Sequence, residues 1–369
     1  MPAPESSFTF ATAPVLHFGV GSLHTLGDRG ASRLGARCLI VTDAGIVKTG
    51  MVDTALQSLA AAGITAEIFS AVEADPSEAT VLDATEMARA ADVDSVIGLG
   101  GGSSLDVAKL VAYLAGTQDC LAQIYGVGLA TGQRLPLVLI PTTAGTGSEV
   151  TPIAIVTTAS SEKMGVVSPA LLPDMAILDP ALTLGLPAPI TAATGIDAMV
   201  HAIEAFASTN ANNNPLSRSL ALDALRRLGS SLLRGVRHGG DIAARGQLLL
   251  GSLLAGQAFA NSPVAAVHAL AYPIGGHFKV PHGLSNALVL PHVLRFNIDT
   301  TPEPYAAMAP AAFPELADLP TPKRAAKPSW TRSPRATATA RWICWARPEA
   351  SPCTSPTDSS GTAWARACP

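Results

Sequence analysis

Four side chains in the second half of the chain are of the types that bind divalent transition metals. Asp197 and His201 lie four residues apart in the segment 194–205, whose pattern predicts a helix, so their side chains share one helix face. His268 and His282 add two imidazoles in segments that carry few charges. A lone histidine in such a segment is more often a hydrogen-bonded core residue, but one carboxylate with three imidazoles suits a divalent metal. The sequence therefore predicts a metal site made of these four residues.

Glu204 stands on the same predicted helix as Asp197. Through a hydrogen bond it could orient a metal ligand without binding the metal itself. Carboxylates on helix surfaces are more often solvated, and we therefore expect Glu204 to face solvent.

The glycine-rich segment 100–109 follows a predicted strand and opens a predicted helix, and it includes Gly101 and Gly102. Consecutive glycines let a backbone pass close to a pyrophosphate, which the free N–H groups and the positive dipole of the helix start would bind. Ser103 and Asp106 have the spacing of a capping box, so they could simply hold the helix start. The segment lacks the G-x-G-x-x-G fingerprint, and a plain strand-to-helix turn is an alternative. We predict that the segment contacts a dinucleotide.

Asp43 ends the first predicted strand, where its carboxylate could accept hydrogen bonds from the ribose of an adenosine. A capping or turn aspartate is equally common at such a position. If Asp43 faces the ribose, a 2′-phosphate would meet it at about 4 Å, where like charges at an effective dielectric of about 20 repel by about 4 kcal/mol. That energy corresponds to about a thousandfold in affinity, so this interpretation predicts NAD rather than NADP.

Apolar runs alternate with helical patterns in the first half of the chain. The predicted strands cover 38–43, 65–69, 95–100 and 136–140, and the predicted helices cover 52–62, 78–91 and 104–114. Strands and helices that alternate at this spacing indicate a parallel sheet with crossover helices. Such sheets bind ligands at the carboxyl ends of their strands, so this half is predicted to be a nucleotide-binding α/β unit.

The composition favours a folded enzyme in a reducing compartment. Hydrophobic residues make up 48% of the 369 residues and charged residues 14%, which excludes disorder along the whole chain. The net charge of −4 gives no reason to expect nucleic acid as a partner. The first residues do not resemble a signal peptide, no apolar run reaches the length of a membrane helix, and the five cysteines have neither metal nor disulfide spacing. We therefore expect a cytoplasmic protein without a membrane partner.

The composition changes abruptly near residue 320. All four tryptophans lie beyond it, and eight basic residues against two acidic ones follow from Lys323 onward. Runs such as 331–335 and 351–356 have neither a helical nor a strand period. Residues 321–369 could be a disordered basic tail, but clustered Trp, Cys, Arg, Pro and Ser are typical of GC-rich DNA translated out of frame. We therefore predict that this atypical segment results from a shift of reading frame between residues 318 and 330.

Four motifs in the right order resemble those of the iron-containing (group III) alcohol dehydrogenase family. They are Gly-Gly-Gly-Ser-x-x-Asp-x-Ala-Lys at 100–109, Pro-Thr-Thr-Ala-Gly-Thr-Gly-Ser-Glu at 141–149, Gly-Ile-Asp-Ala-x-x-His-Ala-x-Glu at 195–204 and His-Gly-Leu-Ser-Asn-Ala at 282–287. The resemblance extends from about Phe8 to about Leu319. It implies an N-terminal nucleotide-binding α/β domain with a Rossmann-like parallel sheet, over 1–185, and an all-α metal-binding C-terminal domain, over 186–320.

The resemblance also implies the cofactors and the reaction. By position, Asp197, His201, His268 and His282 correspond to the metal ligands, for Fe(II) in the family, with zinc also possible. Gly102, Ser103, Thr142, Thr143 and Thr146, together with Asp43 and Lys163, correspond to the dinucleotide contacts. The implied reaction interconverts an alcohol and an aldehyde or ketone, by hydride transfer between NAD(P) and an alkoxide that the metal stabilises. The expected partners are a small alcohol or aldehyde and, in a homodimer or larger homo-oligomer, further copies of the chain.

One family feature differs in this chain. Many members have a second histidine four residues after the third metal ligand, where it is thought to relay protons or contact substrate, but this chain has Tyr272. With an ordinary pKa of about 10, a phenol could donate a hydrogen bond but would relay protons poorly at neutral pH. His277, five residues further on, could replace that histidine or simply lie at the rim of the pocket. Tyr272 and His277 are therefore the two catalytic candidates.

Three alternative functions are compatible with the same motifs. A glycerol-type dehydrogenase of the same superfamily would use zinc, but such enzymes usually lack the second ligand on the aspartate helix, which is His201 here. A hydroxyacid–oxoacid transhydrogenase would keep its nicotinamide bound and would need no added NAD. A non-catalytic protein, disabled by its altered C-terminus, would hold metal and nucleotide without turning over any alcohol.

Overall fold

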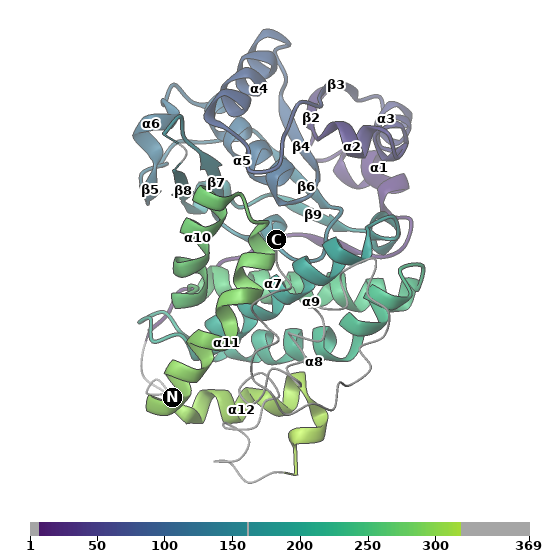
Figure 1. Ribbon diagram of the computed structural model, residues 1–369. Coiled ribbons are helices and arrows are strands. Elements are labelled where there is room, and N and C mark those ends of the chain that lie inside the picture. The colour runs from purple at the N-terminus through teal and green to yellow at the C-terminus, as the bar shows by residue number, and fades with distance from the viewer. Residues whose placement is uncertain (1–6, 161, 319–369) are drawn as a thin grey trace.

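Six parallel strands form the large sheet (Figure 1); the sequence predicts four of them, and the strands Leu16–Phe18 and Met175–Leu178 are additional. The computed structural model describes residues 7–160 and 162–318. The strands are β1 (Leu16–Phe18), β2 (Arg37–Val41), β3 (Thr65–Phe69), β4 (Ser95–Gly100), β6 (Leu137–Pro141) and β9 (Met175–Leu178). Their order in the sheet is β1-β9-β6-β4-β2-β3, and each neighbouring pair is parallel. The predicted α/β fold is confirmed, and the strands predicted over 65–69 and 95–100 have the bounds of β3 and β4.

Helices cover both faces of this sheet. They are α1 (Leu26–Gly30) and α3 (Met51–Ala61) on one face, and α4 (Glu78–Ala90) and α5 (Gly102–Gly116) on the other. The side chains of β2 alternate accordingly, with Cys38 and Ile40 in the core under α3, and Leu39 and Val41 in the core under α4 and α5. Because both faces are buried, the central strands are continuous apolar runs in the sequence, which is why the sequence predicts them well.

A smaller sheet, which the sequence analysis does not predict, lies beside the first. It joins β5 (Gly126–Val127), β8 (Lys163–Val167) and β7 (Ile153–Thr157) in that order, and β7 and β8 are antiparallel. A bridge between Ser77 and Thr157, and a hydrogen bond of 2.8 Å from Thr157 N to Pro76 O, fix β7 to the loop before α4. This arrangement positions Lys163, the first residue of β8.

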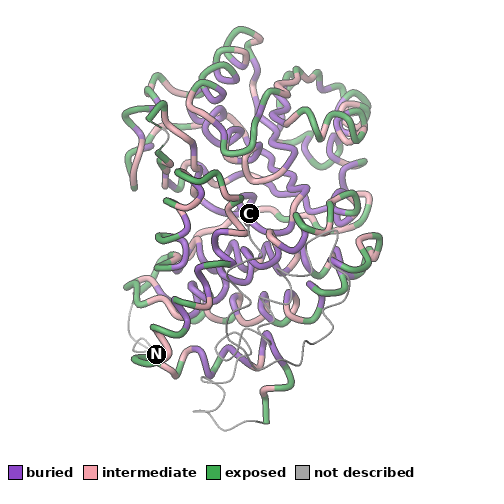
Figure 2. Tube along the Cα trace, in the orientation of Figure 1, coloured by how far each residue is buried: buried purple, intermediate pink, exposed green. Residues whose placement is uncertain are grey.

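Six helices form the second half of the described chain, as predicted. They are α7 (Ala188–Ala207), α8 (Pro215–Arg237), α9 (Ile242–Asn261), α10 (Ala266–Phe278), α11 (His282–Thr300) and α12 (Pro302–Ala312). α7 packs against α8, α9, α11 and α12, and 14 of its 20 residues are buried. Figure 2 shows buried positions gathered in the sheet and in the middle of this helical half. The helix that carries two predicted metal ligands is therefore the central one.

The domain limits and the C-terminal segment remain predictions. The last strand of the large sheet ends at Leu178 and α7 begins at Ala188, and the predicted division falls between them, after residue 185. The predicted atypical segment, 321–369, lies outside the described residues.

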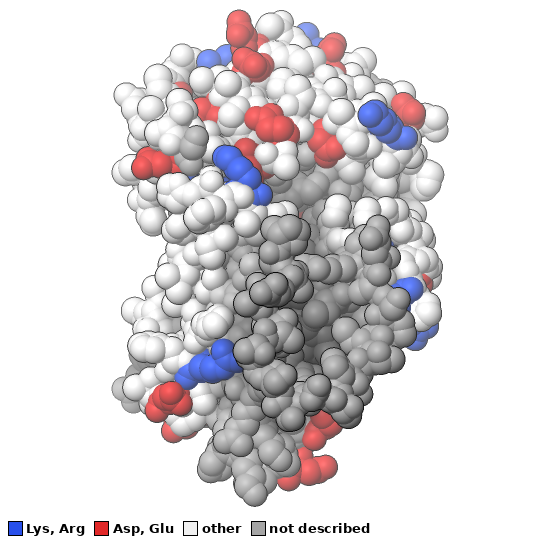
Figure 3. Space-filling model, viewed as in Figure 1, with Lys and Arg blue, Asp and Glu red and all other residues white. Residues whose placement is uncertain are grey.

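Charged side chains of both signs are interspersed on the face of the α/β half shown in Figure 3. Within 7–160 and 162–318, no single helix combines the length and the apolar composition needed to cross a membrane. The bent pair α9 and α10, whose axes differ by 105°, passes that test only when the two helices are taken together.

Candidate metal and dinucleotide site

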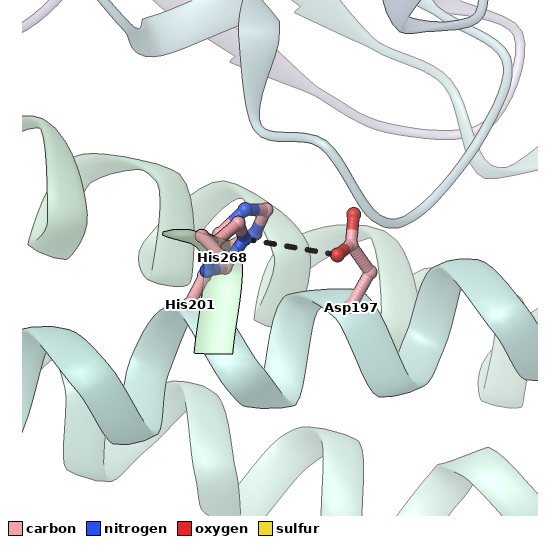
Figure 4. Close-up of side chains that lie close together, drawn as sticks. All are labelled: Asp197, His201 and His268. Atoms are coloured by element: carbon pink, nitrogen blue, oxygen red, sulfur yellow. Dashed lines mark ion pairs between the residues drawn. The ribbon is translucent and has the colours of Figure 1, made fainter. Parts of the chain in front are cut away.

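Asp197 and His201 project from the middle of α7 and are almost fully buried (Figure 4). The i, i+4 spacing puts both side chains on one face of the helix, as predicted. The His201 ring stacks on Phe259 of α9 with ring centroids 4.3 Å apart, and its Nδ1 lies 3.2 Å from Gly145 O. Because a carbonyl oxygen only accepts, Nδ1 carries the ring proton, and the other ring nitrogen, Nε2, is the one suited to bind a metal.

His268 reaches the same point from the first turn of α10 and is 2% exposed. Its Nδ1 lies 2.6 Å from Glu204 Oε2, and because a carboxylate only accepts, the ring proton belongs on Nδ1. Its Nε2 is buried without a hydrogen-bond partner among the described residues, and it lies 3.9 Å from Asp197 Oδ1. A buried imidazole nitrogen without a partner, aimed at a carboxylate, fits a metal that both would bind.

His282, the first residue of α11, completes the group. Its Nε2 lies 3.7 Å from Asp197 Oδ1, and its ring centroid is 5.5 Å from that of His268. The ligand atoms of Asp197, His201 and His268 all lie within 4.8 Å of one another. Metal–ligand bonds of about 2.0–2.2 Å place ligand atoms about 3–4 Å apart, so Asp197, His201 and His268 are close enough to share one divalent metal. His282 Nε2 lies at a similar distance from Asp197 Oδ1 and is the fourth candidate ligand.

The expectation that Glu204 faces solvent is wrong, because this side chain is 5% exposed. Its carboxylate accepts hydrogen bonds from Ala265 N (3.0 Å) and Val267 N (2.7 Å), at the start of α10, as well as contacting His268. A single carboxylate on α7 therefore satisfies amides that the first turn of α10 leaves free and orients the imidazole that α10 carries. The packing of α10 on α7 buries this residue, and a helical pattern in the sequence cannot show that packing.

The surroundings of the four residues favour the protonation states that metal ligands need. Burial opposes a charge on Asp197, but the imidazoles of His282, His201 and His268 outweigh it and hold the pKa of Asp197 below its ordinary value. Burial lowers the pKa of His201 to about 3, so this imidazole is neutral at neutral pH. Metal binding requires an ionised carboxylate and neutral imidazoles, and both shifts agree with that requirement.

The structure brings one of the two catalytic candidates, Tyr272, to the metal ligands. Its ring stacks on that of His282 with centroids 5.7 Å apart and an interplanar angle of 16°. Burial, with a smaller effect of Asp197, raises the pKa of Tyr272 to about 12, so the phenol keeps its proton at neutral pH. The other candidate, His277, is exposed near the end of α10, and five residues along a helix place it on a different face from Tyr272.

The two predicted dinucleotide segments meet at the carboxyl ends of β4 and β6, which are neighbours in the sheet. A Cβ atom on Gly102 would lie 2.7 Å from Thr146 Cγ2, and a Cβ atom on Gly101 would lie 3.5 Å from Thr143 Cγ2. Glycine at 102 therefore permits the close approach of the two segments. Five of the predicted contacts are only partly buried and so can be reached by a ligand, namely Gly101, Gly102, Ser103, Thr143 and Thr146, whereas Thr142 is buried.

Asp43 follows β2 and caps the short helix α2 (Ala44–Val47). Its Oδ1 accepts hydrogen bonds from Gly45 N (2.8 Å) and Ile46 N (3.0 Å). Its Oδ2 faces the glycine segment, since a Cβ atom on Gly100 would lie 3.5 Å from it. Capping uses one oxygen and leaves the other beside the predicted dinucleotide segment, so the two roles considered for Asp43 are compatible.

Asp106 lies behind the glycine segment and is held by the protein itself. Its carboxylate accepts hydrogen bonds from Ser148 Oγ (2.6 Å) and Ile155 N (3.1 Å), and Lys109 Nζ lies 3.7 Å from it. α5 begins without a side-chain cap, so the capping box considered for Ser103 and Asp106 does not form. Asp106 thus ties α5 to the segment between β6 and β7, and its contact with a dinucleotide remains a prediction.

Lys163, the last predicted dinucleotide contact, lies where the two halves of the molecule meet. Its ammonium group lies 2.5 Å from Asp75 Oδ1. The backbone of Asp75 has a φ of 56°, in the left-handed region that residues other than glycine rarely adopt. A Cβ atom on Gly275 of α10 would lie 3.8 Å from Lys163 Nζ. Lys163 is therefore next to the helix that carries His268, and its contact with a dinucleotide remains a prediction.

Two buried polar residues at the site have no predicted role, although both fall within the motifs that carry the resemblance. Glu149 is 1% exposed, its Oε1 has no hydrogen-bond partner in the described part of the chain, and burial raises its pKa to about 7. Asn286 is fully buried and contacts Asp197 and His282. Their place in the motifs at 141–149 and 282–287 was the available signal for both, and it does not say what each side chain contacts.

Two models of one protein family together match most of the chain. A model described as iron-containing alcohol dehydrogenase matches residues 13–180, and one described as the C-terminal part of the Fe-containing alcohol dehydrogenase family matches residues 191–324. Long-chain-alcohol dehydrogenase 1 of Geobacillus thermodenitrificans is 44% identical over 287 residues, which are 77% of this chain and 72% of that protein.

Solved structures share the fold. A crystal structure of 1,3-propanediol oxidoreductase has a TM-score of 0.84 and 35% identity, and the match covers 92% of this chain and 86% of that one. Sulfoacetaldehyde reductase from Bifidobacterium kashiwanohense, solved in complex with NAD+, has a TM-score of 0.77 and 30% identity over 83% of this chain and 81% of that one. These matches confirm the resemblance on which the prediction of a two-part fold depends.

Proposed function

This chain belongs to the iron-containing alcohol dehydrogenase family, and we propose that it oxidises a small alcohol, or reduces the matching aldehyde or ketone, at the site around Asp197. Membership of this family makes the chain an NAD-linked alcohol and aldehyde oxidoreductase. What we propose is which residues bind the metal, the dinucleotide and the substrate. The observation that carries it is the convergence of one carboxylate and three imidazoles within reach of one metal, beside the carboxyl edge of a parallel sheet.

The proposed metal ligands are Asp197, His201, His268 and His282, for Fe(II) or Zn(II). A divalent metal held there supplies a Lewis acid that stabilises negative charge on the substrate oxygen. The chain contributes the fixed orientation of the ligands, through the contact of Glu204 with His268, and a buried surrounding that excludes water on the α7 side. Sites of this kind bind zinc more tightly than iron, so the metal present depends on supply.

The proposed dinucleotide contacts lie on the carboxyl edge of the sheet. A bound nicotinamide dinucleotide supplies the hydride acceptor for alcohol oxidation. The free amides at the start of α5 would bind its pyrophosphate, and Asp43 Oδ2 would accept hydrogen bonds from the adenosine ribose, which favours NAD over NADP. The hydrogen bond that His201 Nδ1 donates to Gly145 O connects this edge to α7, the helix that carries two of the proposed metal ligands. The NAD+ complex of the Bifidobacterium relative supports this assignment.

Tyr272 is the proposed contact of the substrate oxygen. Its ring lies against His282, the most exposed of the four ligand side chains, at 31%. Because the phenol stays protonated at neutral pH, it can donate a hydrogen bond but cannot act as a general base. His277, the other candidate, has less support because it is exposed and lies on a different face of α10.

The alternatives have less support from the site. The presence of His201 in the ligand set argues against a glycerol-type dehydrogenase, as already expected from the sequence. The homodimer or larger homo-oligomer and the cytoplasmic location are proposals that follow from the resemblance and the composition. Analytical ultracentrifugation of the purified chain tests the first of these.

The decisive experiment measures metal content and turnover on the same purified protein. We expect about one divalent metal per chain and NAD-dependent oxidation of short alcohols that stops when a chelator removes the metal. Reduction of an oxoacid without added NAD would instead indicate the transhydrogenase. Bound metal without turnover on any alcohol would indicate the non-catalytic alternative and would contradict the proposal.

A further inference from the structure

Asn286 lies one turn into α11 and is fully buried between two of the proposed metal ligands. Its Nδ2 donates a hydrogen bond of 2.5 Å to Asp197 Oδ1 and lies 3.2 Å from His282 Nε2. The side-chain amide therefore connects a carboxylate on α7 to an imidazole on α11. No role follows for it from the ligand set or from the dinucleotide contacts.

Chemistry fixes the orientation of this amide. A carboxylate oxygen accepts hydrogen bonds only, so the NH₂ group, and not the carbonyl oxygen, must face Asp197. The same NH₂ group then directs its second proton at His282 Nε2, which must accept with its lone pair. The cost of this orientation is visible, because Asn286 Oδ1 is buried without a hydrogen-bond partner among the described residues.

The contact with His282 also selects its tautomer. If Nε2 accepts a hydrogen bond from Asn286, the ring proton of the neutral imidazole is on Nδ1. In this tautomer the unprotonated nitrogen is Nε2, which lies 3.7 Å from Asp197 Oδ1, so its lone pair becomes available to a metal when the hydrogen bond from Asn286 is released. Glu204 does the same for His268, from the opposite side of the ring, by accepting the proton of Nδ1.

We propose that Asn286 is a positioning residue of the metal site, which holds Asp197 and His282 ready for a metal before one binds. In the metal-free protein the NH₂ group of Asn286 bridges the carboxylate and the imidazole. On metal binding Asn286 gives up His282 Nε2 and keeps its hydrogen bond to Asp197, whose oxygen has a second lone pair. This inference rests on the proposed metal site and adds a residue to it.

The first test compares metal affinity among variants, by competition with a chromogenic chelator for Zn²⁺ and for Co²⁺. Asn286→Leu keeps the volume of the side chain and removes both donated hydrogen bonds, and we expect its affinity to fall about 10- to 100-fold. The visible spectrum of bound Co²⁺ should change as well, because Asp197 is no longer oriented. Ser285→Ala is the matched control, since Ser285 is equally buried on α11 but its hydroxyl, within the described residues, contacts the carbonyls of Val280 and Pro281 rather than a proposed metal ligand.

The outcomes separate this inference from the proposed function. A parent protein that binds neither metal tightly would overturn both. Tight binding by the parent and, within about threefold, by folded Asn286→Leu would overturn the role of Asn286 alone. Equal losses in Asn286→Leu and Ser285→Ala would show a general disturbance of α11 and would also overturn it.

A second test needs no variant and so does not depend on how Asn286→Leu folds. Nitrogen NMR of the metal-free parent, labelled with ¹⁵N-histidine, reports which ring nitrogen carries the proton. We expect His282, assigned by its loss in His282→Gln, to have the proton on Nδ1. A His282 ring with its proton on Nε2 contradicts the bridge, because such a nitrogen cannot accept from Asn286.

Discussion

The proposed metal site and the proposed dinucleotide site at the carboxyl edge of the sheet are built from different groups. In the helical half the proposed groups are side chains, and all but His282, which is 31% exposed, are almost completely buried. Asp197, His201, Glu204, His268 and Asn286 are each at most 5% exposed. At the sheet edge the proposed groups are backbone amides and small side chains, and most of them are partly exposed. Substitutions at the metal site therefore remove chemistry, whereas substitutions at the sheet edge change shape or selectivity.

This difference predicts that the two sites can be damaged separately. The metal site depends on α7, α10 and α11 and on the contacts between them, while the sheet edge depends on β4, β6 and the start of α5. The two meet at the hydrogen bond between Gly145 O and His201, and the segment that contains Glu149 packs nearby against α9. His268→Ala and Asp43→Asn are therefore each measured for both metal content and dinucleotide binding or selectivity.

The largest effect is expected for His268→Ala. A four-ligand site that loses its most buried imidazole cannot replace it locally, so most of the metal and at least about a hundredfold of the activity should be lost. The affinity for NADH, measured by its fluorescence, should change by less than about twofold if the two sites are independent. Elemental analysis checks the metal, and His292→Ala, an exposed histidine on α11, is the control. Full metal occupancy in His268→Ala would remove this residue from the ligand set.

Glu149, between the two halves, should make stability depend on pH. Burial raises its pKa in the folded protein to about 7 from an ordinary 4.5, so the folded state holds the proton more tightly than the unfolded state. Its contribution to stability is therefore complete below about pH 4.5 and is lost as the pH rises through about 7. At about pH 8, Glu149→Gln, which cannot ionise, should be more stable than the parent by up to about 3 kcal/mol.

Urea unfolding at about pH 5 and about pH 8 measures this difference. At the lower pH most of the advantage of Glu149→Gln should disappear. The same substitution at Glu86, an exposed residue of α4, should have no such pH dependence. An equal difference in stability between parent and variant at both pH values would show that folding does not shift the pKa of Glu149. The surroundings of Glu149 would then be more accessible to water than its burial in the structure indicates.

A smaller effect, confined to the sheet edge, is expected for Asp43→Asn. Asparagine keeps the cap of α2 but has no charge to repel a 2′-phosphate, so the ratio of kcat/KM for NAD to that for NADP should fall at least about tenfold. Metal content should not change. Asp53→Ala, at an exposed position of α3, should leave the ratio as it is. A ratio that also stays constant in Asp43→Asn would mean that Asp43 only caps the helix.

The smallest effect is expected for Tyr272→Phe. Loss of one hydrogen bond to the substrate costs about 1 kcal/mol, so kcat/KM should fall about fivefold while the ring still packs on His282. The pH profile of kcat should keep its shape, because the phenol of the parent stays protonated up to about pH 12. A loss of more than about a hundredfold with a changed profile would make Tyr272 the proton relay after all. If instead only His277→Asn changes the profile, the relay is His277.

The central strands of the large sheet could be predicted, because their burial in the fold corresponds to a pattern in the local sequence. β2, β4 and β6 are covered on both faces, so each is a largely apolar run that can be recognised as a strand in the sequence. The hairpin of β7 and β8 was not predicted, although β7 alternates between buried and partly exposed residues as a half-covered strand does. β8 has a glycine in its middle and one buried residue, so its own sequence is a weak strand signal, and the pairing with β7 is what completes it.

Within the site, the sequence determined the residue types and one spacing. The helix that carries Asp197 and His201 fixes their separation at one turn, so their common face follows from local geometry alone. Tertiary structure decided the rest. Only the packing of α10 and α11 on α7 brings His268 and His282 to the carboxylate, buries Glu204 and places Asn286 between two ligands. These distances join residues far apart in the chain, and side-chain packing between helices, which a linear pattern does not encode, sets them.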